Sequence, residues 1–433
     1  MIKFISDTLQ RSKIIFILWC MAAAFGAYFC MYALRKPFNN GTYDSYYLWG
    51  LHYKSILIIA QVLGYMTSKF IGIKVISELQ ATQRTAIILS LIGVGLLGLI
   101  LFGIVPYPYN FICLFINGLP LGMVWGVIFS YLEGRQFTEL IAMGLASSQI
   151  MASGVLKTIY FYVQELLPGV TEFWMPAVIG IIFIPAFLFF TWMLARIPPP
   201  SPDDISLRKI RVPMTRDEKR AAWKRFHLAM LCIIVVYCFV TTLRDFRDSF
   251  SVEIWREISS GFDKTIFAQT EITSGFILFF IMGSLSWIKS NRLGFRVVCG
   301  LIYASILISA GSSILYVNQI ISPFWWMQLV GFGLFLGYMP LQIVFFDRFI
   351  AVFNLKANAG FFVYICDAIG YLGSVFLLFF KDIFAAQLNW SKTLMQATVA
   401  HLIISLVLFT AAMIFLAKSS APHLKHAHHH GAS

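Results

Sequence analysis

The sequence predicts an all-α integral membrane protein with twelve transmembrane helices arranged as two six-helix halves. Three observations lead to this class. The chain is 59% hydrophobic and only 12% charged, whereas about 25% of the residues of a soluble domain are charged. Twelve apolar stretches are each long enough to cross a bilayer. A long polar segment follows the sixth stretch and divides the chain into two comparable parts.

The twelve predicted spans follow one another with short connections. The first is not followed by a small-residue cleavage site, so we expect a retained helix and not a signal peptide. The spans are predicted near residues 13–35, 54–77, 85–105, 110–132, 139–163, 174–196, 226–246, 266–289, 295–316, 323–346, 357–380 and 394–417.

The polar segment 198–225 is predicted to be a cytoplasmic linker. Three prolines at 198–200 end the sixth helix. The basic, amphipathic sequence after them predicts a short helix lying on the inner leaflet. The expected organisation is therefore an N-terminal half at 1–197, the linker, a C-terminal half at 226–418 and a disordered tail at 419–433. The histidines of that tail are not assigned a function.

The net charge of +13 is explained by membrane topology, and nucleic-acid binding is not needed to account for it. If the N-terminus is cytoplasmic, most Lys and Arg residues fall on the inner side, which is the positive-inside pattern. Both termini are then cytoplasmic, as in a multi-pass protein of the inner (plasma) membrane. On this assignment the outer loops hold only Lys54, Arg247, Arg256, Lys264, Lys381 and Lys392.

Enzymatic chemistry is not indicated by the sequence. The seven cysteines lie in apolar helix sequence without paired spacing, which is typical of small buried hydrophobic residues and not of disulfides or a metal site. The sequence shows no nucleophile–base constellation, metal-ligand cluster or nucleotide-binding loop. We expect neither enzyme activity nor a metal or other cofactor.

One arginine lies in apolar helix sequence near the start of each half: Arg35 in the first and Arg244 in the second. An ionised arginine inside the bilayer costs at least ~2.5–3.5 kcal/mol, so it is rarely there without a function. Planar guanidinium donors suit phosphate or carboxylate, and the pair predicts a clamp for an anion. The alternatives are snorkelling to the interface or pairing with an acid. Asp245 is a candidate partner of Arg244, although adjacent residues on a helix do not face each other.

An internal repeat supports the division into halves. Gly118-Leu-Pro-Leu-Gly122 resembles Gly333-Leu-Phe-Leu-Gly337, and Leu-Arg at 34–35 and 243–244 recurs at nearly the same offset. Parallel duplication of a six-helix unit, with substrate held midway between the halves, is the architecture of the major facilitator superfamily.

Several motifs share the pattern of one transporter family: Tyr28-Phe-Cys-Met-Tyr32-Ala-Leu-Arg35-Lys36-Pro-Phe38, Ser68-Lys69-Phe70, Phe239-Val-Thr-Thr-Leu-Arg244, Gly337-Tyr338-Met-Pro340, Gly370-Tyr371-Leu-Gly373 and the fourth-helix Trp125. The chain thereby resembles the organophosphate:phosphate antiporters, the glycerol-3-phosphate and hexose-phosphate transporters. It departs from them in lacking their fifth-helix histidine within 146–154. It also has Lys157 one turn further along and an additional Asp367 in the eleventh helix.

The residues and the resemblance together define the expected site. Lys69 adds a third positive charge deep in its helix, whereas Lys36, at a helix end, fits ligand contact or snorkelling equally. Asp367 could be a counter-ion to Lys157 or to a clamp arginine, a proton-coupling site or a partner of a substrate hydroxyl. The expected substrate-binding residues are Arg35, Arg244, Lys69, Tyr32, Lys36, Tyr28, Trp125, Tyr338, Tyr371 and Lys157, with Asp367 as the coupling or counter-ion residue.

The predicted function is secondary transport of a small organic anion by alternating access, most simply an organophosphate exchanged for inorganic phosphate. One alternative is a proton- or sodium-coupled symporter of a carboxylate such as a hexuronate. Another is a sensor that keeps the transporter fold. The expected partners are the anionic substrate, phosphate as counter-substrate and the lipid bilayer, with no nucleic acid and with the chain working as a monomer.

Overall fold

The computed structural model describes residues 9, 12–77, 79–133, 138–199, 216–259, 261–355, 359–384 and 389–427. Within these ranges the chain is almost entirely helical. The first six long helices are α2 (Lys13–Arg35), α3 (Tyr53–Ser77), α4 (Arg84–Ile104), α5 (Phe111–Leu132), α6 (Thr138–Leu166) and α7 (Met175–Ala195). The second six are α9 (Arg216–Ser249), α11 (Ile266–Leu285), α12 (Asn291–Val317), α13 (Pro323–Pro340) with its continuation α14 (Phe346–Val352), α15 (Ala359–Phe384) and α16 (Trp390–Ala427).

These twelve long helices lie at the twelve predicted spans, mostly within a few residues of the predicted ends. Among the described residues, eleven helical segments are long and apolar enough to cross a bilayer. The helix outside that set is α6, which has 29 residues and occupies the predicted fifth span. Its sequence includes Ser147, Ser148, Ser153 and Lys157, and these polar side chains lower its apolar character.

The contacts within the chain define two compact units. Unit 1 comprises Met1–Lys209, Asp248–Ser286 and Leu378–Gln387. It contains α2 to α7, α11, the short helix α10 (Ser251–Ile258), the 3-10 turn η1 (Pro37–Asn40) and a small hairpin of β1 (Tyr47–Leu48) and β2 (Leu51–His52). Each unit combines separate segments of the chain and does not follow chain order. The six-helix halves 1–197 and 226–418 therefore stay a prediction.

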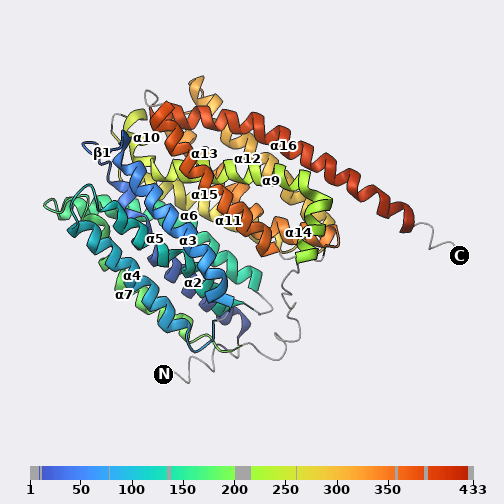
Figure 1. Cartoon of the computed structure of the whole chain (residues 1–433), viewed down its shortest axis with the longest axis horizontal. Coiled ribbons are helices and arrows are strands. Elements are labelled where there is room, and N and C mark those ends of the chain that lie inside the picture. Colours follow the sequence, from blue (N-terminus) through green and yellow to red (C-terminus); the bar gives the residue numbers. More distant parts are fainter. Residues whose placement is uncertain are drawn as a thin grey trace. The chain divides into compact units, whose positions relative to one another are not determined.

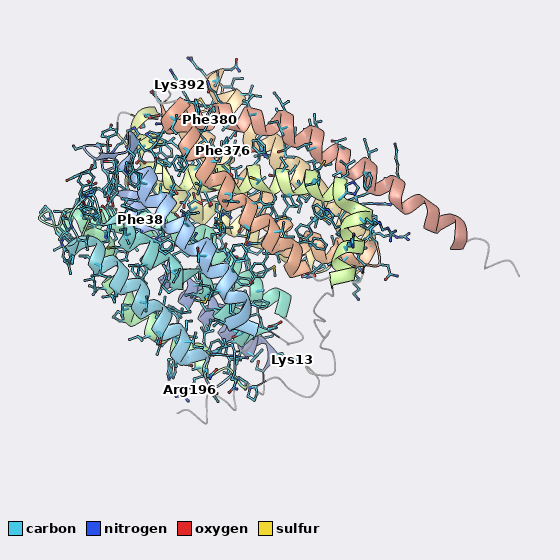
Figure 2. All side chains as sticks on the ribbon, in the orientation of Figure 1. Lys13, Phe38, Arg196, Phe376, Phe380 and Lys392 are labelled. Atoms are coloured by element: carbon cyan, nitrogen blue, oxygen red, sulfur yellow. The ribbon has the colours of Figure 1, made fainter. Side chains whose placement is uncertain are left out.

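Unit 1 is a bundle in which α2, α3, α4, α5 and α7 run alongside one another (Figure 1). Glycines let α3 and α5 approach closely. A Cβ at Gly118 would lie 2.3 Å from the backbone oxygen of Gln61, and one at Gly64 would lie 2.3 Å from that of Phe115. Small residues at such contacts are the usual means of helix packing in a membrane. Figure 2 shows Lys13 and Arg196 at one end of this bundle and Phe38 at the other.

Unit 2 comprises Ile210–Arg247, Trp287–Leu377 and Leu388–Ser433. In it α12 packs against α13 and α16, the long red helix of Figure 1. Polar bonds join these helices: the Thr398 hydroxyl donates to Ser313 Oγ at 2.8 Å, and the Trp326 indole donates to the same oxygen at 3.0 Å. A π turn, η2 (Leu341–Phe345), follows Pro340, which cannot donate a helical hydrogen bond.

Two predicted segments differ from what the structure shows. Residues 200–215 of the linker, where the amphipathic helix is predicted, lie outside the described residues. The rest of that segment, from Arg216, is the beginning of α9 and not a separate helix. At the other end, α16 continues to Ala427, beyond residue 419, where the sequence predicts a disordered tail.

Candidate functional site

Arg35 is buried in the bundle of unit 1, at the end of α2. It is the last residue of α2, and the Gln61 amide donates to its backbone oxygen at 2.9 Å. Gln61 is roughly 12 Å along α3 from the start of that helix at 1.5 Å per residue. Asn117 of α5 donates to the backbone oxygen of Leu34 at 3.1 Å. Two amide side chains thus satisfy carbonyls that a helix end leaves without intrahelical partners.

The guanidinium of Arg35 lies on the face of a tyrosine from α3. Its central carbon is 3.9 Å from the ring centroid of Tyr65 and 5.6 Å from that of Tyr32. The Lys69 ammonium is 5.6 Å from the Tyr65 ring, and the Tyr28 and Tyr32 rings meet edge to face at 5.4 Å. Four of the predicted site residues therefore gather around Tyr65, which the sequence analysis missed. Its position one helical turn before Lys69 is the signal that could have indicated it.

Arg244 has a comparable aromatic setting in unit 2. Its guanidinium carbon is 3.7 Å from the ring centroid of Tyr338 and 6.0 Å from that of Phe335, both on α13. Tyr371, on α15, is an electrostatic neighbour of the same guanidinium. The ring of Tyr237 lies 5.7 Å from that of Tyr338. Two predicted residues, Tyr338 and Tyr371, thus lie near Arg244.

Arg244 is also paired with its neighbour in sequence. Its Nη2 and Nε donate to Asp245 Oδ1 at 2.7 and 3.2 Å. This confirms Asp245 as the candidate partner of Arg244; the objection from helix spacing does not hold here, because the long arginine side chain reaches the carboxylate. The other carboxylate oxygen accepts from Ser374 of α15 at 3.4 Å. The positive charge of Arg244 is therefore paired with the Asp245 carboxylate, and a substrate anion would have to compete with that carboxylate.

Asp367 is buried on α15, with 3% of its surface exposed. Its Oδ1 accepts a hydrogen bond from the Tyr237 hydroxyl of α9. Further along the same two helices, Thr242 donates to the Gly370 backbone oxygen at 3.5 Å. A polar row therefore joins α9 and α15, which gives Asp367 a structural role beside its predicted ones. The counter-ion, proton-coupling and substrate-hydroxyl interpretations all stay predictions.

Lys36 and Lys157 share one carboxylate within unit 1. Asp248, near the end of α9, accepts from Lys157 through Oδ1 and from Lys36 through Oδ2, each at 2.6 Å. Ser153 donates to the same Oδ1, and the Lys157 ammonium also reaches the Asp248 backbone oxygen at 2.6 Å. The lysine side chains are only 12% and 4% exposed. Sequence analysis missed Asp248, although it lies about one turn after Asp245.

Five of the six basic residues predicted in outer loops lie in helices instead: Arg256 in α10, Lys392 in α16 and three that are buried. Lys54 is the second residue of α3 and pairs with Glu253 of α10. Arg247 of α9 donates to the backbone oxygen of Met327 at 3.1 and 2.8 Å. Lys381 of α15 lies 3.8 Å from Asp382. All three lie near helix ends and not in loops. Their partners offset part of the cost of burying the charges. Their place on the outer side stays a prediction.

Trp125 has an aromatic setting of its own on α5. Its ring stacks on that of Phe129, one turn along the helix, with centroids 4.9 Å apart. More than a third of Trp125 is exposed. Its substrate-binding role stays a prediction.

The fold is that of known membrane transporters. Nucleoside transporter NupG is 15% identical with a TM-score of 0.59, and the match covers 92% of this chain and 98% of that one. A peptide transporter, POT, is 13% identical with a TM-score of 0.61 and coverage of 96% and 98%. A D-xylose–proton symporter is 12% identical with a TM-score of 0.55 and coverage of 93% and 97%. These likenesses confirm the predicted all-α membrane fold of the major facilitator superfamily.

Comparisons of the sequence identify one family. Residues 37–419 match a family of unknown function, DUF5690. No curated protein matches the sequence. The resemblance to the organophosphate:phosphate antiporters stays a prediction.

Proposed function

The chain belongs to the family DUF5690, and we propose that it is a secondary active transporter that moves a small organic anion across the inner (plasma) membrane. The anion is an organophosphate, exchanged for inorganic phosphate by alternating access. The protein works as a monomer with both termini in the cytoplasm. The proposal rests on the fold and on the charged residues inside the spanning helices.

One observation carries the proposal: each unit places an arginine on a tyrosine ring within helices of spanning length. These are Arg35 on Tyr65 and Arg244 on Tyr338. A ring against the flat face of a guanidinium leaves its in-plane N–H donors directed sideways. Those donors match two oxygens of one phosphate or carboxylate group. The cost of burying each arginine is easier to understand if a bound anion offsets it.

The preference for phosphate comes from the charges around the two arginines. Lys69 lies in the Arg35 cluster and adds a second cation there. Arg244 is held by Asp245, and a ligand with two negative charges competes with that carboxylate better than a monoanion does. A phosphate monoester carries close to two charges at neutral pH. Tyr28 and Tyr32 would contact its organic part or donate to its oxygens.

A second candidate is a proton- or sodium-coupled symporter of an organic carboxylate. It is favoured by Asp367, a buried carboxylate within a spanning helix that accepts a hydrogen bond from Tyr237. Protonatable carboxylates inside membrane helices commonly belong to coupling pathways. In this case the anion would be a hexuronate-like carboxylate.

Counterflow distinguishes these functions. Purified protein is reconstituted in liposomes preloaded with unlabelled phosphate, and uptake of labelled phosphate is measured without a pH difference. We expect uptake that is competed by sugar or polyol phosphates and not by hexuronates. Uptake of hexuronate that requires an inward proton or sodium gradient would favour the symporter. Binding of these anions without flux would identify a sensor. The absence of both binding and flux would exclude the proposal.

A further inference from the structure

Two buried carboxylates follow Arg247 in the chain, and their surroundings differ. Asp248 has both oxygens paired, one with Lys36 and one with Lys157. Glu253, in the short helix α10, has one oxygen paired with Lys54. The other, Oε2, is buried and has no hydrogen-bond partner among the residues that the structure describes. One carboxylate is thus fully matched as an anion, and the other is not.

The pair formed by Lys54 and Glu253 is isolated from water on both sides. Lys54 is 2% exposed and Glu253 is 8% exposed. Besides the Glu253 oxygen, the lysine ammonium faces the ring of Phe250, with 5.2 Å between the nitrogen and the ring centroid. A buried ion pair repays its desolvation only when further hydrogen bonds satisfy the remaining lone pairs and protons. This pair does not meet that condition at Oε2.

A proton on Oε2 would relieve this mismatch. It removes the buried charge and turns the unmatched oxygen into a neutral hydroxyl, which costs less to bury. Burial raises the pKa of Glu253 above its usual value, although the attraction and hydrogen bond of Lys54, a backbone N–H and, least, Arg256 lower it. The direction is therefore towards proton uptake at pH values above those at which an ordinary glutamate is protonated.

We propose that Glu253 is a proton-binding site and that its protonation releases α10 from α3. The proton comes from water and adds to Oε2, so no covalent bond of the protein breaks. The contact between a lysine cation and a carboxylate anion becomes a hydrogen bond from a cation to a neutral acid. The attraction between the start of α3 and α10 falls accordingly.

The other charged groups around this pair set the limits of the effect. Cations from other helices favour the ionised form of Glu253 and therefore oppose protonation. The titratable groups that act on Glu253 or Lys54 are Arg256 of α10, Lys157 of α6, Lys381 of α15, Tyr43 and Glu172. His52 lies two residues before Lys54, and burial lowers its pKa, so it is the other group whose titration could act on this contact.

The position of the pair gives the proton a consequence for transport. α10 follows α9 in the chain, and α9 carries Arg244. α3 carries Tyr65 and Lys69. A proton that loosens α10 from α3 therefore acts on the helices that hold the proposed anion-binding residues. This site is separate from Asp367 and does not depend on which anion is carried.

Hydrogen–deuterium exchange of the whole protein in lipid nanodiscs tests the proposal without a substrate. Amide exchange in α10 is measured between about pH 8 and about pH 5 and corrected for the pH dependence of intrinsic exchange. In the wild type we expect it to quicken on the order of tenfold towards acid pH, the effect of one pKa unit. Glu253→Gln, which resembles the protonated acid, should exchange fast at every pH.

Matched variants make the result specific. Glu257→Gln makes the same change at an exposed position of the same helix and should keep the wild-type pH response. His52→Gln should keep it as well. Glu253→Asp retains a carboxyl group, and should retain a response with a displaced midpoint even if Glu253→Gln does not fold. A flat wild-type profile, a response that persists in Glu253→Gln, or its loss in His52→Gln would each overturn the proposal.

Discussion

The shared carboxylate of Asp248 gives a prediction whose size can be estimated from the structure. Replacing it with Asn removes one negative charge and keeps a side chain of nearly the same size and shape. Lys36 and Lys157, with side chains 12% and 4% exposed, then lose the carboxylate that they share. Two ammonium groups would remain close together in a region with little access to water.

Removing one partner of a buried ion pair costs about 3–5 kcal/mol, because the remaining charge is left uncompensated. The amide oxygen of the substituted side chain could still accept one hydrogen bond, which returns about 0.5–1.5 kcal/mol. We therefore expect Asp248→Asn to lower the free energy of unfolding by about 3 kcal/mol. Adding Lys157→Met should recover at least about 1 kcal/mol, because one uncompensated cation is removed.

The free energy of unfolding is measured by equilibrium titration with SDS in mixed micelles for the two single variants and the double variant. Asp263→Asn, at an exposed carboxylate, is the matched control. The amide oxygen can still accept the bond from the Thr265 N–H, so stability should change by no more than about 0.5 kcal/mol. An Asp248→Asn protein as stable as the wild type would refute the reasoning. So would a double variant whose loss equals the sum of the two single losses.

Three further predictions concern topology, coupling and the tyrosine ring against Arg35. Cysteine labelling should place 198–225 and both termini in the cytoplasm, and labelling of that linker from outside intact cells would overturn the topology. Asp367→Asn should change affinity and leave exchange insensitive to an imposed proton gradient, whereas loss of gradient-driven accumulation would make Asp367 the coupling site. Tyr65→Leu should weaken anion binding by about 2- to 30-fold, since a cation on a ring is worth about 0.5–2 kcal/mol. Tyr65→Phe keeps the ring and should weaken binding much less. Equal weakening by both variants would show that the ring does not support anion binding.

The spans could be predicted from sequence because the bilayer fixes the length of an apolar helix. α5 and α7 begin and end within about a residue of the predicted positions. The clustering of Tyr28, Tyr32 and Arg35 could also be predicted, since all three lie on one helix at known spacing.

The partners across helices could not be predicted from one sequence. Lys157 and Asp248 are 91 residues apart, and Lys54 and Glu253 are 199 apart. Helical periodicity indicates which face of a helix is apolar, but it does not say which neighbour supplies a counter-charge. Helix spacing alone counted against the candidate pairing of Arg244 with Asp245, because that argument neglects how far a flexible arginine side chain reaches.

Phosphate counterflow by the two arginine variants tests the central claim most directly. Arg35→Lys and Arg244→Lys keep the charge but replace a planar fork with a point charge, so each should slow exchange by at least an order of magnitude. Both are compared with the wild type in proteoliposomes of matched protein content and thermal stability. Loss of exchange in both variants is the result that we predict. Exchange at near wild-type rates in both would contradict the role of the arginines as the anion-binding residues.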